Sequence, residues 1–255
     1  MIWDGFRLAV SLLSVLPLRA RQVTRRTSAV AMAVTPAVGL LLGAAGAATL
    51  SAADHVLRLA PLLSAVLALA AIALLTGGLH LDGLADLADG LGSRKPAREA
   101  LDIMRRSDIG AFGAATLVFT LLVQVAALAQ AEVRGHGPIA LIAAAVTGRL
   151  AIAWACRRGV AAARAQGMGA LVAGTLPPVI AVAITAVVLG LAGVVAVVLP
   201  SPSGGWLLPV GIAAGLAASL AVARHAVARL GGITGDVLGA LTEIGTAACL
   251  IVMAA

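Results

Sequence analysis

Three aspartates stand at a spacing that suits metal chemistry. Asp82, Asp86 and Asp89 are separated by four and then three residues, so a helix would place their carboxylates within about 60° of one another on one face. Like charges on one helix face repel unless a cation neutralises them. Carboxylate oxygens suit Mg²⁺ or Mn²⁺ bound together with substrate phosphates. The spacing predicts a divalent-cation site; the competing interpretation is a solvated loop whose acids pair with nearby basic residues.

Other polar residues surround these aspartates. His80 stands two residues before Asp82, where an imidazole can act as a general base or orient a neighbouring group, although histidine also occurs at membrane boundaries without such a role. We expect His80 and Asp82 to be catalytic. Arg105 and Arg106 follow on the same segment, and guanidinium groups bind phosphates well. We therefore expect both arginines to bind the substrate.

A second motif lies near the C-terminal end, Gly231-Gly232-Ile233-Thr234-Gly235-Asp236. Glycines beside a helix N-terminus leave backbone N–H groups available to an anion. We expect Gly232, Thr234 and Gly235 to bind a substrate phosphate and Asp236 to join the metal ligands.

Glu243 follows Asp236 by seven residues and falls inside an apolar stretch. At the helical rise it would lie about 10 Å into a membrane span, where an acid needs a partner or a functional role. Arg149, also inside an apolar stretch, is the candidate partner for an ion pair.

The remainder of the chain must hold these groups in a membrane. Of its 255 residues, 61% are hydrophobic and 11% are charged, whereas about a quarter of residues are charged in soluble domains. We expect an all-α, polytopic integral membrane bundle of about seven transmembrane helices (six to eight), formed by one domain over residues 1–255. The expected spans are residues 27–53, 59–79, 109–131, 137–156, 179–199, 206–223 and 237–255, with an interfacial helix within 1–18 and a turn at 200–205.

The charge distribution orients the expected bundle. Fourteen of the eighteen Lys and Arg residues fall on one side: four before the first span, five in the central segment 76–113, three at 157–164, plus Arg224 and Arg229. The positive-inside rule makes that side cytoplasmic, so the site opens at the cytoplasmic edge of the bundle. This bias also explains the net charge of +7 without nucleic-acid binding, which 2% aromatic residues do not favour.

Small residues recur at four-residue spacing within the expected spans, as in Gly39/Gly43 and Gly211/Gly215. This spacing lets helix backbones approach closely, so it predicts packing faces. Cys156 and Cys249 form no metal-ligand or CxxC spacing, and we expect both to be small core residues.

The two motifs resemble those of a known family. Residues 77–90, with His80-Leu81-Asp82-Gly83, then Ile103-Met104-Arg105 and Ile109-Gly110-Ala111-Phe112-Gly113, and finally residues 231–243, resemble the cobalamin synthase family, adenosylcobinamide-GDP ribazoletransferase. The resemblance implies a Mg²⁺-dependent transferase in the bacterial inner membrane. Its substrates would be adenosylcobinamide-GDP and α-ribazole or its 5′-phosphate, and GMP would be released as the nucleotide loop of adenosylcobalamin is completed.

One departure and two alternatives stand beside this resemblance. The family has an acid, then Ser, then a basic residue before Ile-Gly, whereas this chain has Arg106-Ser107-Asp108. A CDP-alcohol phosphotransferase also uses aspartates at the membrane edge, but its motif has Ala-Arg after the first Asp-Gly, and here Asp86 follows Ala85. A transporter would place its ionisable groups near the membrane midplane, where this chain offers only Arg149 and Glu243.

Overall fold

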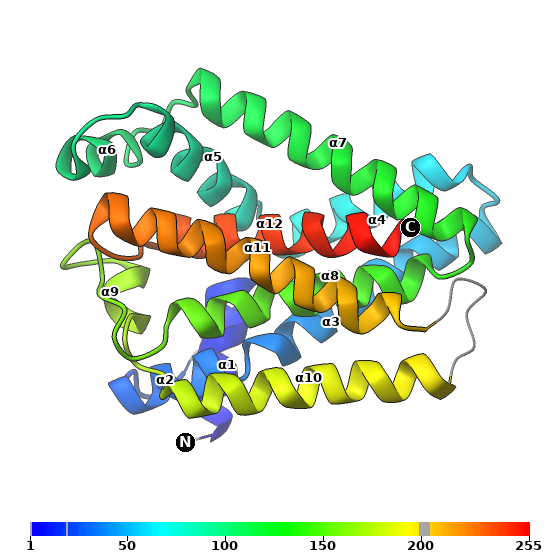
Figure 1. Ribbon diagram of the computed structural model, residues 1–255, viewed down its shortest axis with the longest axis horizontal. Coiled ribbons are helices and arrows are strands. Elements are labelled where there is room, and N and C mark those ends of the chain that lie inside the picture. The colour runs from blue at the N-terminus through cyan, green and yellow to red at the C-terminus, as the bar shows by residue number, and fades with distance from the viewer. Residues whose placement is uncertain (1, 19, 199–204) are drawn as a thin grey trace.

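The protein is a bundle of helices (Figure 1). The computed structural model describes residues 2–18, 20–198 and 205–255. The helices in chain order are α1 (Ile2–Leu13), α2 (Arg25–Ala33), α3 (Thr35–Ser51), the π-helical turn η1 (Ala52–Val56), α4 (Pro61–Leu75), α5 (Leu79–Gly92), α6 (Ala97–Ile103), α7 (Ala111–Val133), α8 (Gly137–Ala155), α9 (Met168–Val172), α10 (Pro178–Val198), α11 (Leu207–Leu230) and α12 (Gly235–Met253).

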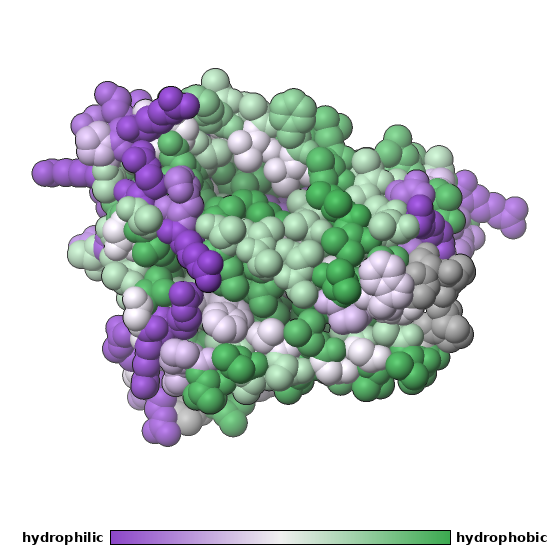
Figure 2. Space-filling view, in the orientation of Figure 1, coloured by the Kyte–Doolittle hydropathy of each residue, from purple (hydrophilic) through white to green (hydrophobic). Residues whose placement is uncertain are grey.

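Within the described residues, six helices are long and apolar enough to cross a membrane: α3 continued by η1, α7, α8, α10, α11 and α12. The consecutive helices α4 and α5 form a seventh candidate, bent by 89°. The long helices lie side by side along the long axis in Figure 1, and Figure 2 shows a broad hydrophobic belt over them with hydrophilic residues gathered at both ends. The chain is a polytopic membrane protein, which confirms the predicted fold class.

The two ends of the bundle carry different charges. One end holds α6 and the first turn of α12, and we call it the α6 end; the opposite end holds η1, and we call it the η1 end. The helix directions place the basic segments 94–106, 157–164 and 224–229 at the α6 end, and Arg58 and Arg134 at the η1 end. The grouping of basic residues expected from the sequence is therefore present.

The span predicted over residues 27–53 is two helices, because α2 ends at Ala33 and α3 begins at Thr35. Pro36 lies in the first turn of α3. Proline has no N–H and its ring clashes with a preceding helical turn, so it starts a helix more readily than it continues one. The prediction of one continuous helix was wrong here, although Thr35–Val56 remains long enough to cross a membrane.

The predicted second span, residues 59–79, ends early at Leu75. Gly77 and Gly78 have φ angles of +61° and +72°, which glycine adopts without the steric cost that other residues meet. These two residues turn the chain between α4 and α5. The central segment that follows is not the solvated loop of the competing interpretation, because it contains the helices α5 and α6.

Residues 224–236, which we expect to form a loop between two spans, are mostly helical. Helix α11 continues to Leu230, and Gly231 ends it with a φ of +80°, the left-handed cap at which many helices stop. The loop prediction was therefore wrong for 224–230. The helix carries its charged residues on an exposed face, so they do not require it to end with the apolar stretch. Only residues 231–234 connect α11 to α12.

Two predicted segments extend beyond the described residues. The turn at 200–205 lies outside the described residues except for Gly205, and so does Leu199, the predicted last residue of the fifth span.

Helix α1 has 12 residues, or about 18 Å, which is too short for a hydrocarbon layer of about 30 Å. It packs on α2, so a short helix that does not span is present within 1–18, as expected.

Glycines allow the spans to pack closely, as their spacing predicted. A Cβ atom on Gly39 would lie 2.6 Å from the carbonyl oxygen of Ala145, where α3 meets α8, and one on Gly215 would lie 2.5 Å from the carbonyl oxygen of Gly245, where α11 meets α12. Neither site can hold a larger residue without moving a helix.

Both cysteines are buried and unpaired, as predicted. Cys156 and Cys249 have no exposed surface, and each belongs to the apolar core. They fill space within the bundle and lie apart from the acidic motif.

Candidate active site

Helix α5 presents the three predicted aspartates at the α6 end. Asp82 is exposed, and Asp86 and Asp89 are partly buried, while Leu84 and Leu87 on the other side of the helix are buried. This distribution is that of an amphipathic helix whose polar face carries the acids. The helical interpretation of the aspartate spacing is confirmed.

Gly83 brings α5 into backbone contact with the first turn of α12. A Cβ atom on Gly83 would lie 2.7 Å from the carbonyl oxygen of Asp236 and 2.9 Å from its Cα atom. One turn along α12, Gly239 meets the backbone of His80 in the same way, at 3.1 Å. A side chain at Gly83 would push the two helices apart. The glycine is therefore what places Asp236 beside the aspartates of α5.

Asp86 lies close enough to the other three carboxylates for their charges to affect its ionisation. Burial, followed by the negative charges of Asp82, Asp236 and Asp89, raises the pKa of Asp86 to about 6, and the positive charge of Arg164 opposes this rise. Burial is the larger cause, and the rest of the rise in the pKa of Asp86 reflects an excess of negative charge from the three other carboxylates. A divalent cation would relieve that excess.

Arg164 is the cation that the fold supplies to this site. Its Nη1 atom lies 3.5 Å from Oδ2 of Asp236, and its Nη2 atom donates a hydrogen bond to the carbonyl oxygen of Leu101 at 2.7 Å. A bridge between Ala162 and Ile233 holds its segment against the connection to α12. Sequence reasoning counted Arg164 only as a basic residue of a connection, because nothing in its neighbours points to Asp236.

Asp89 has a structural role that its spacing did not reveal. Its Oδ2 atom accepts a hydrogen bond from the backbone N–H of Gly110 at 2.7 Å, and its Oδ1 atom accepts one from the N–H of Gly113 at 2.9 Å. These amides belong to the start of α7, where N–H groups lack helical partners. Each carboxylate oxygen keeps a further lone pair, so metal binding by Asp89 stays a prediction.

The glycine-rich connection to α12 also has structural roles. Gly232 packs against the chain at 161–163, where a Cβ atom would lie 2.5 Å from the carbonyl oxygen of Ala161. Thr234 is buried, and its hydroxyl oxygen accepts the N–H of Val237 at 3.2 Å, which caps α12. Gly235 has space around it. Phosphate binding by these three residues remains a prediction.

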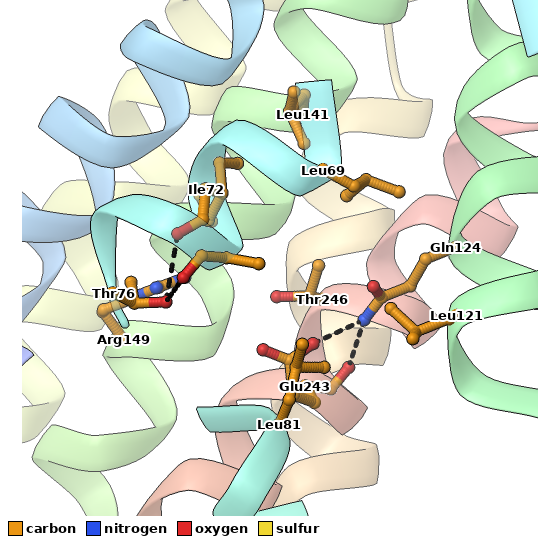
Figure 3. A pocket seen from close by; sticks show the side chains of 12 residues that line it. Leu69, Ile72, Thr76, Leu81, Leu121, Gln124, Leu141, Arg149, Glu243 and Thr246 are labelled. Carbon is orange, nitrogen blue, oxygen red and sulfur yellow. Dashed lines mark hydrogen bonds between the residues drawn. The ribbon is translucent and has the colours of Figure 1, made fainter. Parts of the chain in front are cut away.

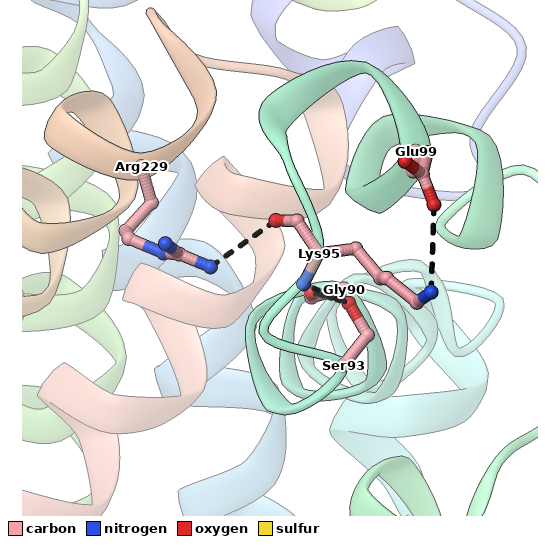
Figure 4. A network of polar contacts seen from close by, with 5 residues as sticks. All are labelled: Gly90, Ser93, Lys95, Glu99 and Arg229. Carbon is pink, nitrogen blue, oxygen red and sulfur yellow. Dashed lines mark hydrogen bonds and ion pairs between the residues drawn. The ribbon is translucent and has the colours of Figure 1, made fainter.

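The connection between α5 and α6 is tied to α11 (Figure 4). Arg229 donates a hydrogen bond from Nη2 to the carbonyl oxygen of Lys95 at 3.3 Å, and Lys95 Nζ lies 3.7 Å from Oε2 of Glu99. Beyond α6, Arg105 and Arg106 are exposed. Their guanidinium groups are accessible to a substrate at the α6 end, and their predicted contact with it remains to be tested.

His80 lies inside the bundle, unlike its neighbour Asp82. It is 2% exposed, and Nη2 of Arg149 lies 3.3 Å from its Nδ1 atom. Because a guanidinium group only donates, Nδ1 must be the acceptor and the ring proton must be on Nε2. The Nε2 atom is buried without a partner. This placement suits a residue that positions α5 better than one that reaches a substrate.

Arg149 and Glu243 border one small cavity (Figure 3). The cavity has a volume of about 30 Å³, enough for one or two water molecules. Glu243 accepts a hydrogen bond through Oε2 from Nε2 of Gln124 at 2.8 Å, whereas Arg149 is bonded to His80. The two charged residues expected to pair each have a different hydrogen-bonding neighbour, and their opposite charges still interact across the cavity.

A second acidic cluster lies at the η1 end. Oxygen or nitrogen atoms of Asp54, His55 and Glu132 lie within 4.8 Å of one another, and the described residues hold no other such group of three. Glu132 follows Gly113 by 19 residues along α7, so it lies about 28 Å from the α5 aspartates by helical rise. This cluster cannot belong to the site at the α6 end.

With this geometry in view, comparison with known proteins identifies the family. The family model described as cobalamin-5-phosphate synthase matches residues 5–254. The chain belongs to the cobalamin-5-phosphate synthase family. No solved structure matches it.

Relatives of this family member match over almost their whole length. The adenosylcobinamide-GDP ribazoletransferase of Frankia casuarinae is 43% identical over 259 residues, which cover 97% of this chain and 93% of that protein. The protein of the same name from Nocardioides is 37% identical over 99% of both chains, and that of Bradyrhizobium diazoefficiens is 38% identical over 98% of this chain and 92% of its own.

The site of this cobalamin-5-phosphate synthase family member contains the kinds of group that phosphoryl transfer uses. Carboxylates from α5 and α12 meet at one end of the bundle, one arginine is fixed among them, and further arginines are exposed nearby. Phosphoryl transfer depends on positioning and on neutralising charge, and it needs no nucleophile from the protein. Hard oxygen donors fit Mg²⁺, which is commonly held by one or two carboxylates plus substrate phosphates.

Proposed function

We propose that the chain is a membrane-bound adenosylcobinamide-GDP ribazoletransferase. It joins adenosylcobinamide-GDP to α-ribazole or its 5′-phosphate, which yields adenosylcobalamin or its 5′-phosphate together with GMP. The observation that carries this proposal is the contact between Gly83 and Asp236. It brings together the two motifs that carry the family resemblance, which lie far apart in the sequence.

The reaction exchanges one phosphorus–oxygen bond for another. A hydroxyl oxygen of the ribazole bonds to the phosphorus attached to cobinamide, and the bond from that phosphorus to the oxygen shared with GMP breaks. GMP keeps the shared oxygen, and the hydroxyl proton passes to a base or to water. A Mg²⁺ ion, when bound, would neutralise charge on the diphosphate.

The residues of the proposed site have two kinds of role: some hold the metal, and others orient those ligands or bind the substrate. Asp82, Asp86, Asp89 and Asp236 would hold the metal, and Asp89 also caps α7. Asp82 is the exposed acid of α5, so we assign it to direct contact with the substrate or its proton. Arg164 orients Asp236. Arg105 and Arg106 would bind the phosphate that departs with GMP.

His80 has a positioning role in this proposal. Its ring is buried and bonded to Arg149, so it fixes the first turn of α5 against α8. The segment then enters the site at Asp82, two residues later. Contact between the His80 ring and a substrate would require α5 to move.

The decisive assay uses purified protein in detergent with adenosylcobinamide-GDP and α-ribazole 5′-phosphate. We expect GMP and the corrinoid product to appear in equal amounts with Mg²⁺, to stop with EDTA, and to return when Mg²⁺ is restored. Product formation that is unaffected by EDTA would remove the metal from the proposal and keep the reaction. The absence of product from folded, Mg²⁺-loaded protein would overturn the reaction itself.

We further propose that the α6 end faces the cytoplasm of a bacterial cell and that residues 1–255 form one membrane domain. The excess of Lys and Arg at the α6 end supports the orientation, and one apolar core with members from α1 to α12 supports the single domain. Both native cysteines are buried. A Ser107→Cys variant should therefore react with an impermeant maleimide in inverted vesicles and not in intact spheroplasts.

A further inference from the structure

A pocket on the flank of the bundle combines an apolar floor with two arginines. It lies between the last turns of α8 and α11 and has a volume of about 320 Å³. Its lining consists of apolar and small residues apart from Arg157 and Arg224. These residues are at the α6 end, where hydrophilic residues border the hydrophobic belt in Figure 2. The pocket therefore lies where lipid tails give way to headgroups.

The two arginines carry positive charge that the described protein does not neutralise. Nη1 of Arg157 donates to the carbonyl oxygen of Trp154 at 2.8 Å, and the guanidinium carbon lies 6.0 Å from the centre of the indole ring. Arg224 is exposed. Among the described residues, neither has an acidic side chain within 4 Å. Two like charges at one apolar pocket favour an anionic ligand.

The floor of the pocket is fixed in place. Nε1 of Trp154 donates a hydrogen bond to Oγ1 of Thr185 on α10 at 2.8 Å, so the indole is held between α8 and α10. Leu220 and Val227 of α11 form the facing wall. This apolar wall suits a ligand with an acyl portion.

From these observations we propose that the pocket binds an anionic phospholipid of the surrounding membrane. The phosphate group lies between Arg157 and Arg224, and the first carbons of the acyl chains lie on Trp154 and the apolar residues of α11. A volume of 320 Å³ is roughly ten times the share of one water molecule in the liquid, about 30 Å³. The space exceeds what a free phosphate needs.

The test uses the fluorescence of Trp154 as the reporter. The other tryptophans, Trp3 and Trp206, are exposed, so the W3F/W206F chain leaves Trp154 as the only emitter. This chain is reconstituted in phosphatidylcholine vesicles that contain a minor fraction of brominated phosphatidylglycerol or, separately, of brominated phosphatidylcholine. We expect stronger quenching by phosphatidylglycerol, with an affinity preference of about fivefold for each arginine.

Variants separate the pocket from general charge at the membrane. R224Q removes an exposed arginine and should reduce the preference for phosphatidylglycerol to about fivefold, the share of the remaining arginine. R157Q/R224Q should respond equally to both lipids. The matched control, R26Q/R158Q, removes two exposed arginines of the same end that do not line the pocket, and it should keep the preference.

Three results would overturn the proposal. Equal quenching by the two lipids in the unsubstituted pocket would mean that no anionic lipid is selected. Recovery of fluorescence on addition of inorganic phosphate or GMP would instead make the pocket a phosphate subsite for soluble substrates. A preference that R224Q leaves unchanged counts against the arginines, and because Arg224 is exposed, misfolding would not explain that result.

Discussion

The two ends of α7 each carry a cluster of acids, and they are built in opposite ways. At the η1 end, Asp54 and His55 are neighbours on one π-helical turn, and the His55 Nδ1 atom lies 3.1 Å from Oδ2 of Asp54. An imidazole, which carries charge only when protonated, thus stands inside this cluster. At the α6 end, acids from α5 and α12 meet around one arginine and stay in excess. Compactness alone therefore does not identify a site, and the proposal for the α6 end rests on its carboxylates and the exposed cations beside them.

The largest expected effect comes from removing one acid of the α6 end. Asp82→Asn should lower the turnover number about 100- to 1000-fold, because loss of a metal ligand removes several kcal/mol of transition-state stabilisation. The same substitution at the other end, Asp54→Asn, is the matched control and should leave turnover within about twofold. GMP release under saturating Mg²⁺ measures both. A large loss for Asp54→Asn and none for Asp82→Asn would reverse the comparison.

A smaller but still large effect should follow from forcing α5 away from α12. Gly83→Ala places a Cβ atom 2.7 Å from the backbone of Asp236, and overpacking of this kind costs about 1–3 kcal/mol. We expect lower thermal stability and a raised Mg²⁺ requirement. Gly190→Ala on α10 is the control, since a Cβ atom there meets nothing within 4 Å. If both variants bind Mg²⁺ alike, the contact does not set the site.

Loss of the hydrogen bonding between Gln124 and Glu243 inside the bundle should have a smaller effect on stability and activity. Gln124→Leu removes the two hydrogen bonds that join α7 to the side chain and backbone of Glu243 on α12, and such bonds between membrane helices contribute on average about 0.6 kcal/mol each. We expect a slightly lower unfolding midpoint in detergent and an unchanged turnover number. Loss of activity without loss of stability would show that Glu243 takes part in the chemistry.

The smallest effect is expected at the η1 end itself. Glu132→Gln keeps the shape of a side chain whose Oε2 atom is buried without a partner, and it should change neither turnover nor the Mg²⁺ concentration for half-maximal activity by more than about twofold. A Mg²⁺ titration of both quantities is the measurement. A shifted titration would mean that the two clusters are coupled along α7.

Much of the site was predictable from local pattern. The spacing of Asp82, Asp86 and Asp89 indicated a shared helical face, which the structure confirms, and the apolar stretches indicated the spans. Periodicity carries this information because a helix repeats within a few residues. The Val34 break could also have been read from Pro36, since proline lies in the first turn of many helices.

What could not be predicted depends on contacts between distant segments. Arg164 acts on Asp236 only because a bridge between Ala162 and Ile233 aligns their segments. Asp89 caps α7 because the chain returns to it after α6. No local pattern encodes either contact. Arg149 and Glu243, the candidate ion pair, interact through their opposite charges across one cavity, while each has a hydrogen-bonding neighbour that the sequence did not indicate.

The meeting of α5 with α12 also orders events during synthesis of the chain. The ribosome completes α5 at Gly92 and begins α12 at Gly235, 143 residues later (235 minus 92), which takes about 7 to 30 seconds at bacterial rates of translation. Throughout that interval the acidic helix lacks Asp236, and Arg164 is added about halfway through, 72 residues after Gly92 (164 minus 92). A nascent chain therefore cannot form the proposed site until α12 has inserted.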